Sequence, residues 1–287
     1  MAKSKVSRNE LGRMILPYAD HFPGRILSIC NLSTGVKVIE RKLTKRQLYL
    51  LKKGIFGHFL ECRSFPFCGV ILHNILLRQV DHGEYRLEDQ LWFQIGEHLI
   101  CLSIGEWCLI TGLSYGVDTT LINNKSGYEL LKMCFGGDLF RNINLKQFDA
   151  LFEKLNFEAM DDINTLKITL FYFVDRVLNG RNSHCQINFD WLNEVDDINY
   201  FQNRPWGHLS WETIYDNLDN ALYEKDEKFK MAQLENSNHK IEKYNLYDFK
   251  SEAWIYEAIG GLPPSWVVKR RKRFPASCNG SSWLLLK

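Results

Sequence analysis

Helix-start signals recur along this chain of 287 residues and constrain its fold more than any other feature. A capping box has Ser or Thr just before a helix and Glu or Gln three residues later, so that two free backbone N–H groups at the helix start are satisfied. Three segments within a hundred residues have this spacing: Thr44 to Gln47, Ser103 to Glu106 and Ser126 to Glu129. Glycines follow each apolar stretch, where helices commonly end. The sequence therefore predicts an assembly of helices.

Apolar residues at helical spacing predict further helices. We expect these over residues 69–80, 145–155, 161–178, 190–202, 211–233 and 251–259. The β-prone runs Leu91–Ile95 and Leu99–Leu102 flank a loop that contains Gly96, which is typical of a β-hairpin. Strands and helices do not alternate, which argues against a parallel α/β sheet. We expect a mainly α, multi-helix globular domain with one small β-hairpin at about 91–102.

Charge is distributed unevenly, although the formal net charge is only +2. Residues 1–56 carry 12 basic and 3 acidic side chains, residues 57–268 carry 18 and 31, and residues 269–287 carry 6 and none. The basic ends either lie on the acidic body or contact an acidic partner such as nucleic acid. The bases near the N-terminus show no interleaved aromatic array for stacking on nucleobases, which favours the first interpretation.

Together, charge and pattern predict three regions. Residues 1–49 form a basic, irregular N-terminal region, residues 50–265 form the helical domain, and residues 266–287 form a basic, disordered tail. Because helical periodicity is confined to the middle region, we expect the packed core to lie there.

The eight cysteines form no Cys-x-x-Cys pair, and several interrupt apolar runs. The first residues lead into no apolar segment of a secretory signal peptide, and the longest apolar runs fall short of the roughly 18 residues that span a bilayer. We therefore expect reduced thiols, no partnership with a membrane, and a nuclear or otherwise cytoplasmic protein that is not secreted.

The sequence does not indicate a catalytic centre. No Asp precedes a Cys, so the nucleophile setting of SUMO-type proteases is missing, and no Cys-x-x-Cys metal-ligand pair, phosphate-binding loop or dinucleotide motif occurs. His58 and Cys62 are four residues apart and could bind a metal if that segment is helical, but a half-buried, aromatic-rich turn is the favoured interpretation. Asp161 and Asp162 begin a predicted helix, where acidic side chains are expected, and a metal-ligand role would need a third acid. We expect no catalytic residue, no cofactor and no metal.

Two local features are candidate sites. Five consecutive bases are typical of a nuclear-import signal or a nucleic-acid patch, and they are Lys269, Arg270, Arg271, Lys272 and Arg273. Trp206 lies between a proline and a glycine, and such a rigid turn either presents the aromatic ring as an anchor for a partner or pins a loop to its own core.

Four segments together resemble a plant family of domains of unknown function (DUF1985): Phe56–Leu60, Leu72–Arg78, Leu91–Gly96 and Glu106–Leu113. Phe201–Gly207 and Ala253–Ala258 fit the same pattern, so the resemblance covers about residues 50–265. Members of this family are found upstream of SUMO-protease-type (Ulp1-like) cysteine peptidase domains in transposon-derived proteins. No catalytic residues are established in this region of the family. The chain carries no peptidase domain and departs from the pattern after Lys269, so it resembles a truncated member.

These observations leave three hypotheses. The first is a non-catalytic helical binding or targeting module of a transposon-derived plant protein, located in the nucleus. The second is the N-terminal portion of a SUMO-type cysteine protease whose catalytic domain is missing from this chain. The third is a nucleic-acid-binding domain that uses its basic ends. The partner is a protein or a nucleic acid, and the sequence does not identify it.

Overall fold

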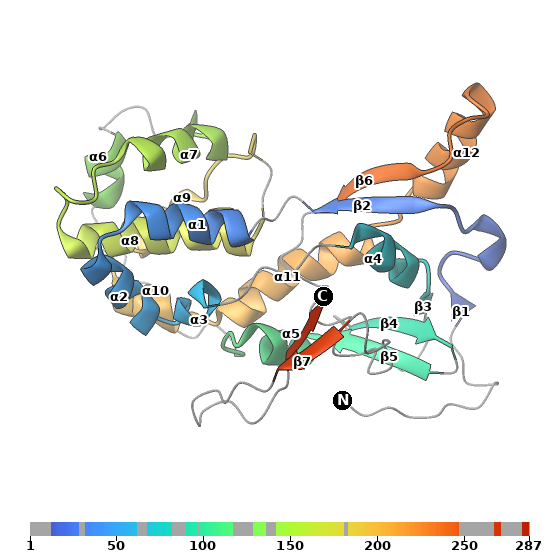
Figure 1. Ribbon diagram of the computed structural model, residues 1–287, viewed down its shortest axis with the longest axis horizontal. Coiled ribbons are helices and arrows are strands. Elements are labelled where there is room, and N and C mark those ends of the chain that lie inside the picture. Colours follow the sequence, from blue (N-terminus) through green and yellow to red (C-terminus); the bar gives the residue numbers. More distant parts are fainter. Residues whose placement is uncertain are drawn as a thin grey trace. The chain divides into compact units, whose positions relative to one another are not determined.

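The computed structural model describes residues 13–28, 32–61, 68–81, 90–96, 98–116, 129–135, 142–180, 183–246, 267–270 and 283–286 (Figure 1). The chain divides into two units, each built from separate segments. Unit 1 consists of Met1–Ser28, Phe65–Tyr115 and Gly207–Lys287. Unit 2 consists of Ile29–Ser64 and Gly116–Trp206.

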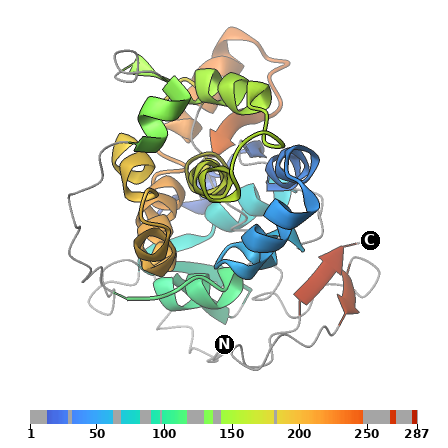
Figure 2. The same ribbon diagram turned by 90° about the vertical axis from the view of Figure 1, so that its left-hand side faces the viewer.

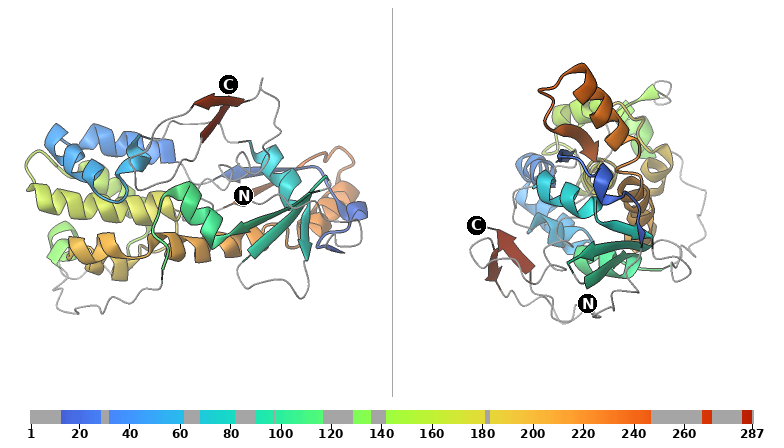
Figure 3. Two further views of the ribbon diagram at one scale, coloured as in Figure 1. Left: turned by 90° about the horizontal axis from the view of Figure 1, so that it is seen from below. Right: turned by 90° about the vertical axis from the view of Figure 1, so that its right-hand side faces the viewer.

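The predicted hairpin is confirmed and lies in an antiparallel sheet of unit 1. The sheet has the strand order β1-β3-β4-β5, with β1 Arg13–Met14, β3 Gln79–Asp81, β4 Gln90–Ile95 and β5 His98–Ser103. β4 and β5 pair from Gln90 opposite Ser103 to Ile95 opposite His98. Gly96 in the turn has φ of 62°, a left-handed conformation that glycine adopts without strain. Figure 3 shows β4 and β5 side by side in teal.

Unit 1 also contains a two-stranded parallel ribbon, formed by β2 Gly24–Ser28 and β6 Glu242–Leu246. Helix α4 covers one face of this ribbon closely, because a Cβ at Gly24 would lie only 2.4 Å from the His73 imidazole. The helices of unit 1 among the described residues are η1 Tyr18–Asp20, α4 Gly69–Leu76, α5 Ile104–Thr111, the part of α11 Trp206–Asp219 from Gly207 onward, and α12 Lys225–Glu235. Phe229 of α12 packs in a small buried cluster with Phe22 and Leu77.

Unit 2 is helical throughout its described residues. Figure 2 looks along its central helix α8, with α1 and α2 in blue on one side and α6 and α7 in green above. The helices are α1 Leu32–Lys42, α2 Lys45–Lys53, α3 Gly57–Leu60, α6 Glu129–Phe135, α7 Leu145–Lys154, α8 Asp162–Tyr172, α9 Phe189–Glu194 and α10 Ile198–Asn203. A π-helical segment, Phe173–Leu178, continues α8. Stacked aromatic rings fill the core, among them Phe152 and Tyr172 with centroids 4.1 Å apart.

Helix starts and stops follow the sequence closely. The capping boxes at Thr44 and Ser103 are confirmed, and Asn144 forms another with Gln147. Gly112 ends α5 in the left-handed conformation, with φ of 69°. The predicted box at Ser126 and the predicted helix over 251–259 lie outside the described residues.

Several predicted boundaries differ. The region 1–49, expected to be irregular, contains α1, the start of α2 and the strands β1 and β2. The helix expected over 69–80 ends at Leu76, because the last residues extend into β3 and pair with the hairpin. The helix expected over 190–202 is two helices, since the Asp197 side chain accepts a hydrogen bond from Tyr200 N and starts α10 anew. The expected helix 211–233 is likewise divided into α11 and α12.

The tail contains a strand pair where the sequence predicted disorder. β7 Val267–Arg270 pairs antiparallel with β8 Trp283–Leu286. The β-branched and large apolar residues of the two segments favour extended structure, which explains why these eight residues pair. Within the described part of the chain, no helix combines the length and the apolar character needed to cross a membrane.

Candidate nucleic-acid interface on helix α2

The side chain of Gln47, which is 3% exposed, fixes which face of helix α2 points toward the core. Its side-chain oxygen accepts a hydrogen bond from Thr44 N at 3.0 Å, which completes the capping box. Its amide nitrogen donates to the carbonyl of Phe157 at 2.9 Å and to the hydroxyl of Thr165 at 3.3 Å. Leu51, one turn further along, is 1% exposed. Because these residues face the core of unit 2, the opposite face of α2 is exposed.

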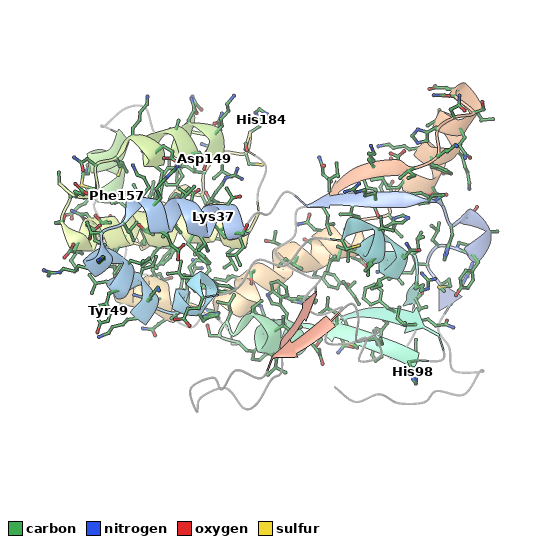
Figure 4. The ribbon with its side chains drawn as sticks, in the orientation of Figure 1. Lys37, Tyr49, His98, Asp149, Phe157 and His184 are labelled. Carbon is green, nitrogen blue, oxygen red and sulfur yellow. The ribbon has the colours of Figure 1, made fainter. Side chains whose placement is uncertain are left out.

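This exposed face consists of four bases and one aromatic residue: Lys45, Arg46, Tyr49, Lys52 and Lys53. Their spacing places them on one side of two helical turns, over about 12 Å at a rise of about 1.5 Å per residue. Tyr49 is 57% exposed and points outward from α2 in Figure 4. The Lys53 ammonium lies 4.5 Å from the centre of the Tyr49 ring, a cation–π arrangement. We call this set the α2 basic face.

Most of the charge on the α2 basic face is not neutralised by acidic side chains. Arg46 forms an ion pair with Asp162, whose carboxylate lies 2.7 Å from the guanidinium, and the Arg46 side chain is still 82% exposed. Lys45, Lys52 and Lys53 have no acidic partner among the described residues. Lys45 lies in the first turn, where the helix dipole disfavours a positive charge. Helix stability therefore does not account for this base.

The neighbouring bases of α1 differ, because they are used within the fold. The Lys42 ammonium donates to the carbonyls of Glu153 and Leu155 at 2.6 and 2.8 Å, at the C-terminal end of α7. Arg41 pairs with the carboxylate of Glu153. Cations at a helix C-terminus stabilise it through the helix dipole. These two bases hold α1 against α7, whereas the lysines of α2 remain available to a partner.

A row of exposed bases around a tyrosine is suited to a phosphate backbone with accessible nucleobases. Lysine and arginine neutralise phosphates without reading sequence, and an exposed aromatic ring offers a surface for base stacking. When the N-terminal bases are compared residue by residue along the chain, no such combination is visible. In helical phase, Leu48 and Leu51 lie on one side of α2, and the bases and Tyr49 lie on the other. Helical phase was the signal that could have revealed the face.

The predicted basic run lies only partly in the described structure. Lys269 and Arg270 belong to β7, opposite Leu284 and Trp283 of β8. Arg271, Lys272 and Arg273 lie outside the described residues. The import hypothesis therefore stays a prediction.

Trp206 is an internal residue, so the structure argues against its role as a partner anchor. Its side chain is 0% exposed, and its indole N–H donates to the carbonyl of Phe201 at 2.6 Å. The rings of Phe56 and Trp191 lie 6.0 and 5.5 Å away, and the Arg204 guanidinium lies 5.2 Å from the ring. The large apolar ring is more stable in this aromatic core than in water, so it pins the loop to its own unit.

Three of the described cysteines, Cys101, Cys108 and Cys134, lack the low thiol pKa of a nucleophile. Burial raises the pKa of the Cys108 thiol to about 11 and that of Cys134 to about 12, and the nearby Asp196 adds to the rise at Cys134. Burial, with Glu106, raises the pKa of Cys101 to about 12. A thiol with so high a pKa is hardly ever a thiolate at neutral pH. Among the described residues, no cluster of His, Cys, Asp or Glu side chains is suited to a metal ion.

One acid of each adjacent Asp-Asp pair caps a helix. Asp161 accepts hydrogen bonds from the backbone N–H groups of Ile163 and Asn164 at 2.9 and 3.0 Å. The bond from Asn164 is the main cause that lowers the pKa of the Asp161 carboxyl. In a second pair, Asp197 caps α10, and Asp196 accepts a hydrogen bond from Lys167 at 3.3 Å. These carboxylates are occupied within the fold of unit 2.

Comparison with known proteins identifies a family without assigning an activity. No curated protein and no solved structure matches this chain. Residues 76–217 match the model of the family described as Domain of unknown function (DUF1985). These residues include the confirmed hairpin, the helices of unit 2 from α6 to α10, and most of α11. The chain is therefore a member of the DUF1985 family.

Proposed function

We propose that this chain is a non-catalytic binding module that holds the backbone of a nucleic acid on the α2 basic face. The observation that carries the proposal is the exposed set of four bases around Tyr49. Among the residues that the structure describes, only Arg46 of this set forms an ion pair with an acidic side chain. Electrostatic contact with phosphates dominates the affinity of nucleic-acid-binding proteins. The raised thiol pKa values of Cys101, Cys108 and Cys134 support a module in which these three cysteines are not nucleophiles.

The test is the salt dependence of binding to a fluorescent oligonucleotide. Replacing Lys45, Lys52 and Lys53 by alanine removes three charges from one face. We expect at least tenfold weaker binding in low salt. Each lost phosphate contact should reduce the log–log salt slope by about 0.7 on single strands or about 0.9 on duplexes.

A matched control replaces three other exposed lysines of unit 2, Lys132, Lys146 and Lys154, by alanine. The two variants have the same net charge, so a general electrostatic attraction would weaken both equally. Equal loss in the two variants would contradict a site on α2. A Tyr49→Leu variant separates stacking from charge, because it should weaken binding to single strands more than binding to duplexes.

We also propose nuclear localisation, which rests on the basic run Lys269–Arg273. Replacing all five bases by alanine should move a fluorescent fusion from the nucleus to the cytoplasm and leave the midpoint of thermal unfolding nearly unchanged. The rival interpretation is a tail that lies on the acidic body. It predicts unchanged localisation and a lower unfolding midpoint in low salt, with about 0–1 kcal/mol per exposed pair. A wild-type fusion located in the cytoplasm would contradict nuclear import.

The origin in a plant mobile element and the association with a SUMO-type cysteine protease are also proposals, and they rest on the family resemblance. A SUMO-vinyl-sulfone probe tests whether the chain itself has the activity of such a protease. We expect no labelling of any of the eight cysteines, since no Cys follows an Asp in the sequence. Labelling of the native chain that is lost on denaturation would instead favour a peptidase.

A further inference from the structure

The β2–β6 ribbon has one buried and one exposed face, which is unusual for a parallel pair. Parallel strands normally occur where both faces are covered. Here Ile26, Tyr244 and Leu246 are buried, whereas Arg25 and the residues that alternate with the buried ones along both strands are exposed. Those further exposed positions are Leu27, Lys243 and Asn245. The ribbon therefore lacks a cover on this face among the described residues.

The hydrogen bonds of the ribbon also leave one edge of β6 open. Glu242 N donates to the carbonyl of Pro23 at 2.9 Å, so the backbone groups of Glu242 point toward β2. In a parallel pair, alternate residues of a strand bond to the same neighbour. The N–H and C=O groups of Lys243 and Asn245 consequently point to the opposite edge. No described strand pairs there, because the sheet contains β2 and β6 alone among the described strands. Figure 1 shows the two strands side by side.

The exposed face carries two like charges in direct opposition. Arg25 and Lys243 are partners in the register of the two strands, and both are exposed. Like charges opposite each other destabilise a sheet. Neither base forms an ion pair with an acid among the described residues. The nearby carboxylate of Glu242 is instead contacted by the His239 ring at 3.0 Å. An acidic group from outside would relieve this repulsion.

We propose that the open edge of β6 binds an extended acidic peptide of a partner protein as a third strand. The peptide backbone bonds to the N–H and C=O groups of Lys243 and Asn245. Every second peptide side chain then lies on the exposed face beside Lys243, and a carboxylate there neutralises the pair of bases. Adding a strand to an open edge derives affinity from backbone hydrogen bonds and specificity from alternate side chains. The free backbone groups favour a peptide over a nucleic acid.

This site is independent of the proposed function, because it lies in unit 1 whereas the α2 basic face lies in unit 2. Failure of either proposal leaves the other standing. The lysine-to-alanine changes on α2 should not alter peptide binding, and changes in the ribbon should not alter the salt slope of oligonucleotide binding.

The test measures fluorescence anisotropy of a labelled peptide of alternating glutamate and valine with the full chain. We expect the wild type to bind it and to bind a scrambled peptide of the same composition at least tenfold more weakly. The double variant Arg25→Glu, Lys243→Glu should no longer bind the acidic peptide and should instead bind a peptide of alternating lysine and valine. The matched control Lys240→Glu changes an exposed lysine just outside β6 and should bind like the wild type.

A backbone test uses Asn245→Pro with Asn245→Ala as its control. Proline removes only the N–H that points to the open edge, so pairing with β2 is retained, and circular dichroism checks the fold. We expect at least fivefold weaker peptide binding for the proline variant and no change for the alanine variant. If the proline variant does not fold, the charge-reversal pair decides alone.

Four results would overturn the proposal. They are equal binding of the alternating and scrambled peptides, undiminished binding by a folded Asn245→Pro variant, oligonucleotide binding that the charge reversal removes, and self-association of the chain that Asn245→Pro removes. The last two would assign the surface to a nucleic acid or to a second copy of the chain.

Discussion

A buried polar cluster in unit 1 differs in charge from one in unit 2. In unit 1, the His73 ring is 1% exposed and lies 2.8 Å from both the Phe22 carbonyl and the Tyr244 hydroxyl. The carbonyl can only accept, so Nε2 donates to it. Burial lowers the pKa of His73 and so favours the neutral ring, in which Nδ1 accepts a hydrogen bond from the hydroxyl. In unit 2, Arg204 and Glu194 form an ion pair whose side chains are 10% and 7% exposed.

Two kinds of buried polar contact therefore each join separate segments of a unit, but they are disrupted by different changes. The neutral cluster joins the segment just before β2 to α4 and β6. Burial favours its uncharged forms by lowering the pKa of His73 and raising that of Tyr244. The ion pair joins α9 to the residue after α10, with the Arg204 guanidinium 5.2 Å from the Trp206 ring. A buried charge depends on its partner, whereas a buried neutral ring depends on pH.

The largest expected effect comes from breaking the ion pair on one side. Arg204→Met leaves the Glu194 carboxylate buried without its partner, and loss of one member of such a pair costs about 3–5 kcal/mol. Chemical denaturation of the variant should show this loss in the free energy of unfolding.

The control for this prediction is the double variant Arg204→Met, Glu194→Leu. Replacing both charges by apolar groups of similar size is often neutral or stabilising, so the double variant should recover most of the loss. If the double variant is no more stable than Arg204→Met, the cost arises from lost packing around Trp206 and not from an unpaired charge.

An intermediate effect is expected in the neutral cluster. Tyr244→Phe removes the hydroxyl that donates to His73 and leaves a buried ring nitrogen without a partner. The cost of such a group is about 1–3 kcal/mol. Tyr18→Phe is a matched control, because Tyr18 is 62% exposed. The loss of unfolding free energy in this variant should be negligible. Equal unfolding midpoints for the two variants would mean that the bond to His73 adds no stability.

Local sequence signals predicted local structure well. Side-chain capping at Thr44 and Ser103 and the turn at Gly96 depend on residues within a few positions of one another, so the sequence contains the whole pattern. Helix α1 was missed although Leu32, Val36 and Ile39 have helical spacing. Gly35 lies within this helix, although glycine is unfavourable in a helix interior, and a Cβ there would lie only 2.4 Å from Val177. The glycine permits close packing of α1.

Contacts between distant segments were not predictable from the sequence. The β2–β6 ribbon pairs residues 24–28 with residues 242–246, and neither segment carries a local signal that selects the other. The His73 cluster depends on that pairing, since it joins Phe22, just before β2, to Tyr244 of β6. The α2 basic face is intermediate between these two cases. Its residues are close together in the sequence, but they share one face only when the chain is wound into a helix.

The smallest and most diagnostic effect is a pH dependence confined to the neutral cluster. Burial lowers the pKa of His73 below its usual value of about 6.5, and the nearby His21 adds to this, against the opposing hydrogen bond from the ring to the Phe22 carbonyl. As the pH falls below about 6.5, the unfolded chain binds a proton that the folded chain excludes. Stability from this cluster is therefore complete above that pH and is lost below it. The slope is at most about 1.4 kcal/mol per pH unit.

The matched variant His73→Gln isolates the contribution of His73 to this pH dependence of stability. Glutamine can donate to the Phe22 carbonyl and accept from the Tyr244 hydroxyl, but it does not titrate. Unfolding free energies measured between pH 7.5 and 5.5 should therefore fall more steeply for the wild type than for His73→Gln. The other histidines contribute equally to both proteins, so the difference between the two slopes belongs to His73. Identical slopes would show that the ring is not held neutral. The two clusters would then no longer differ in their response to pH, since the Glu194–Arg204 pair contains no histidine.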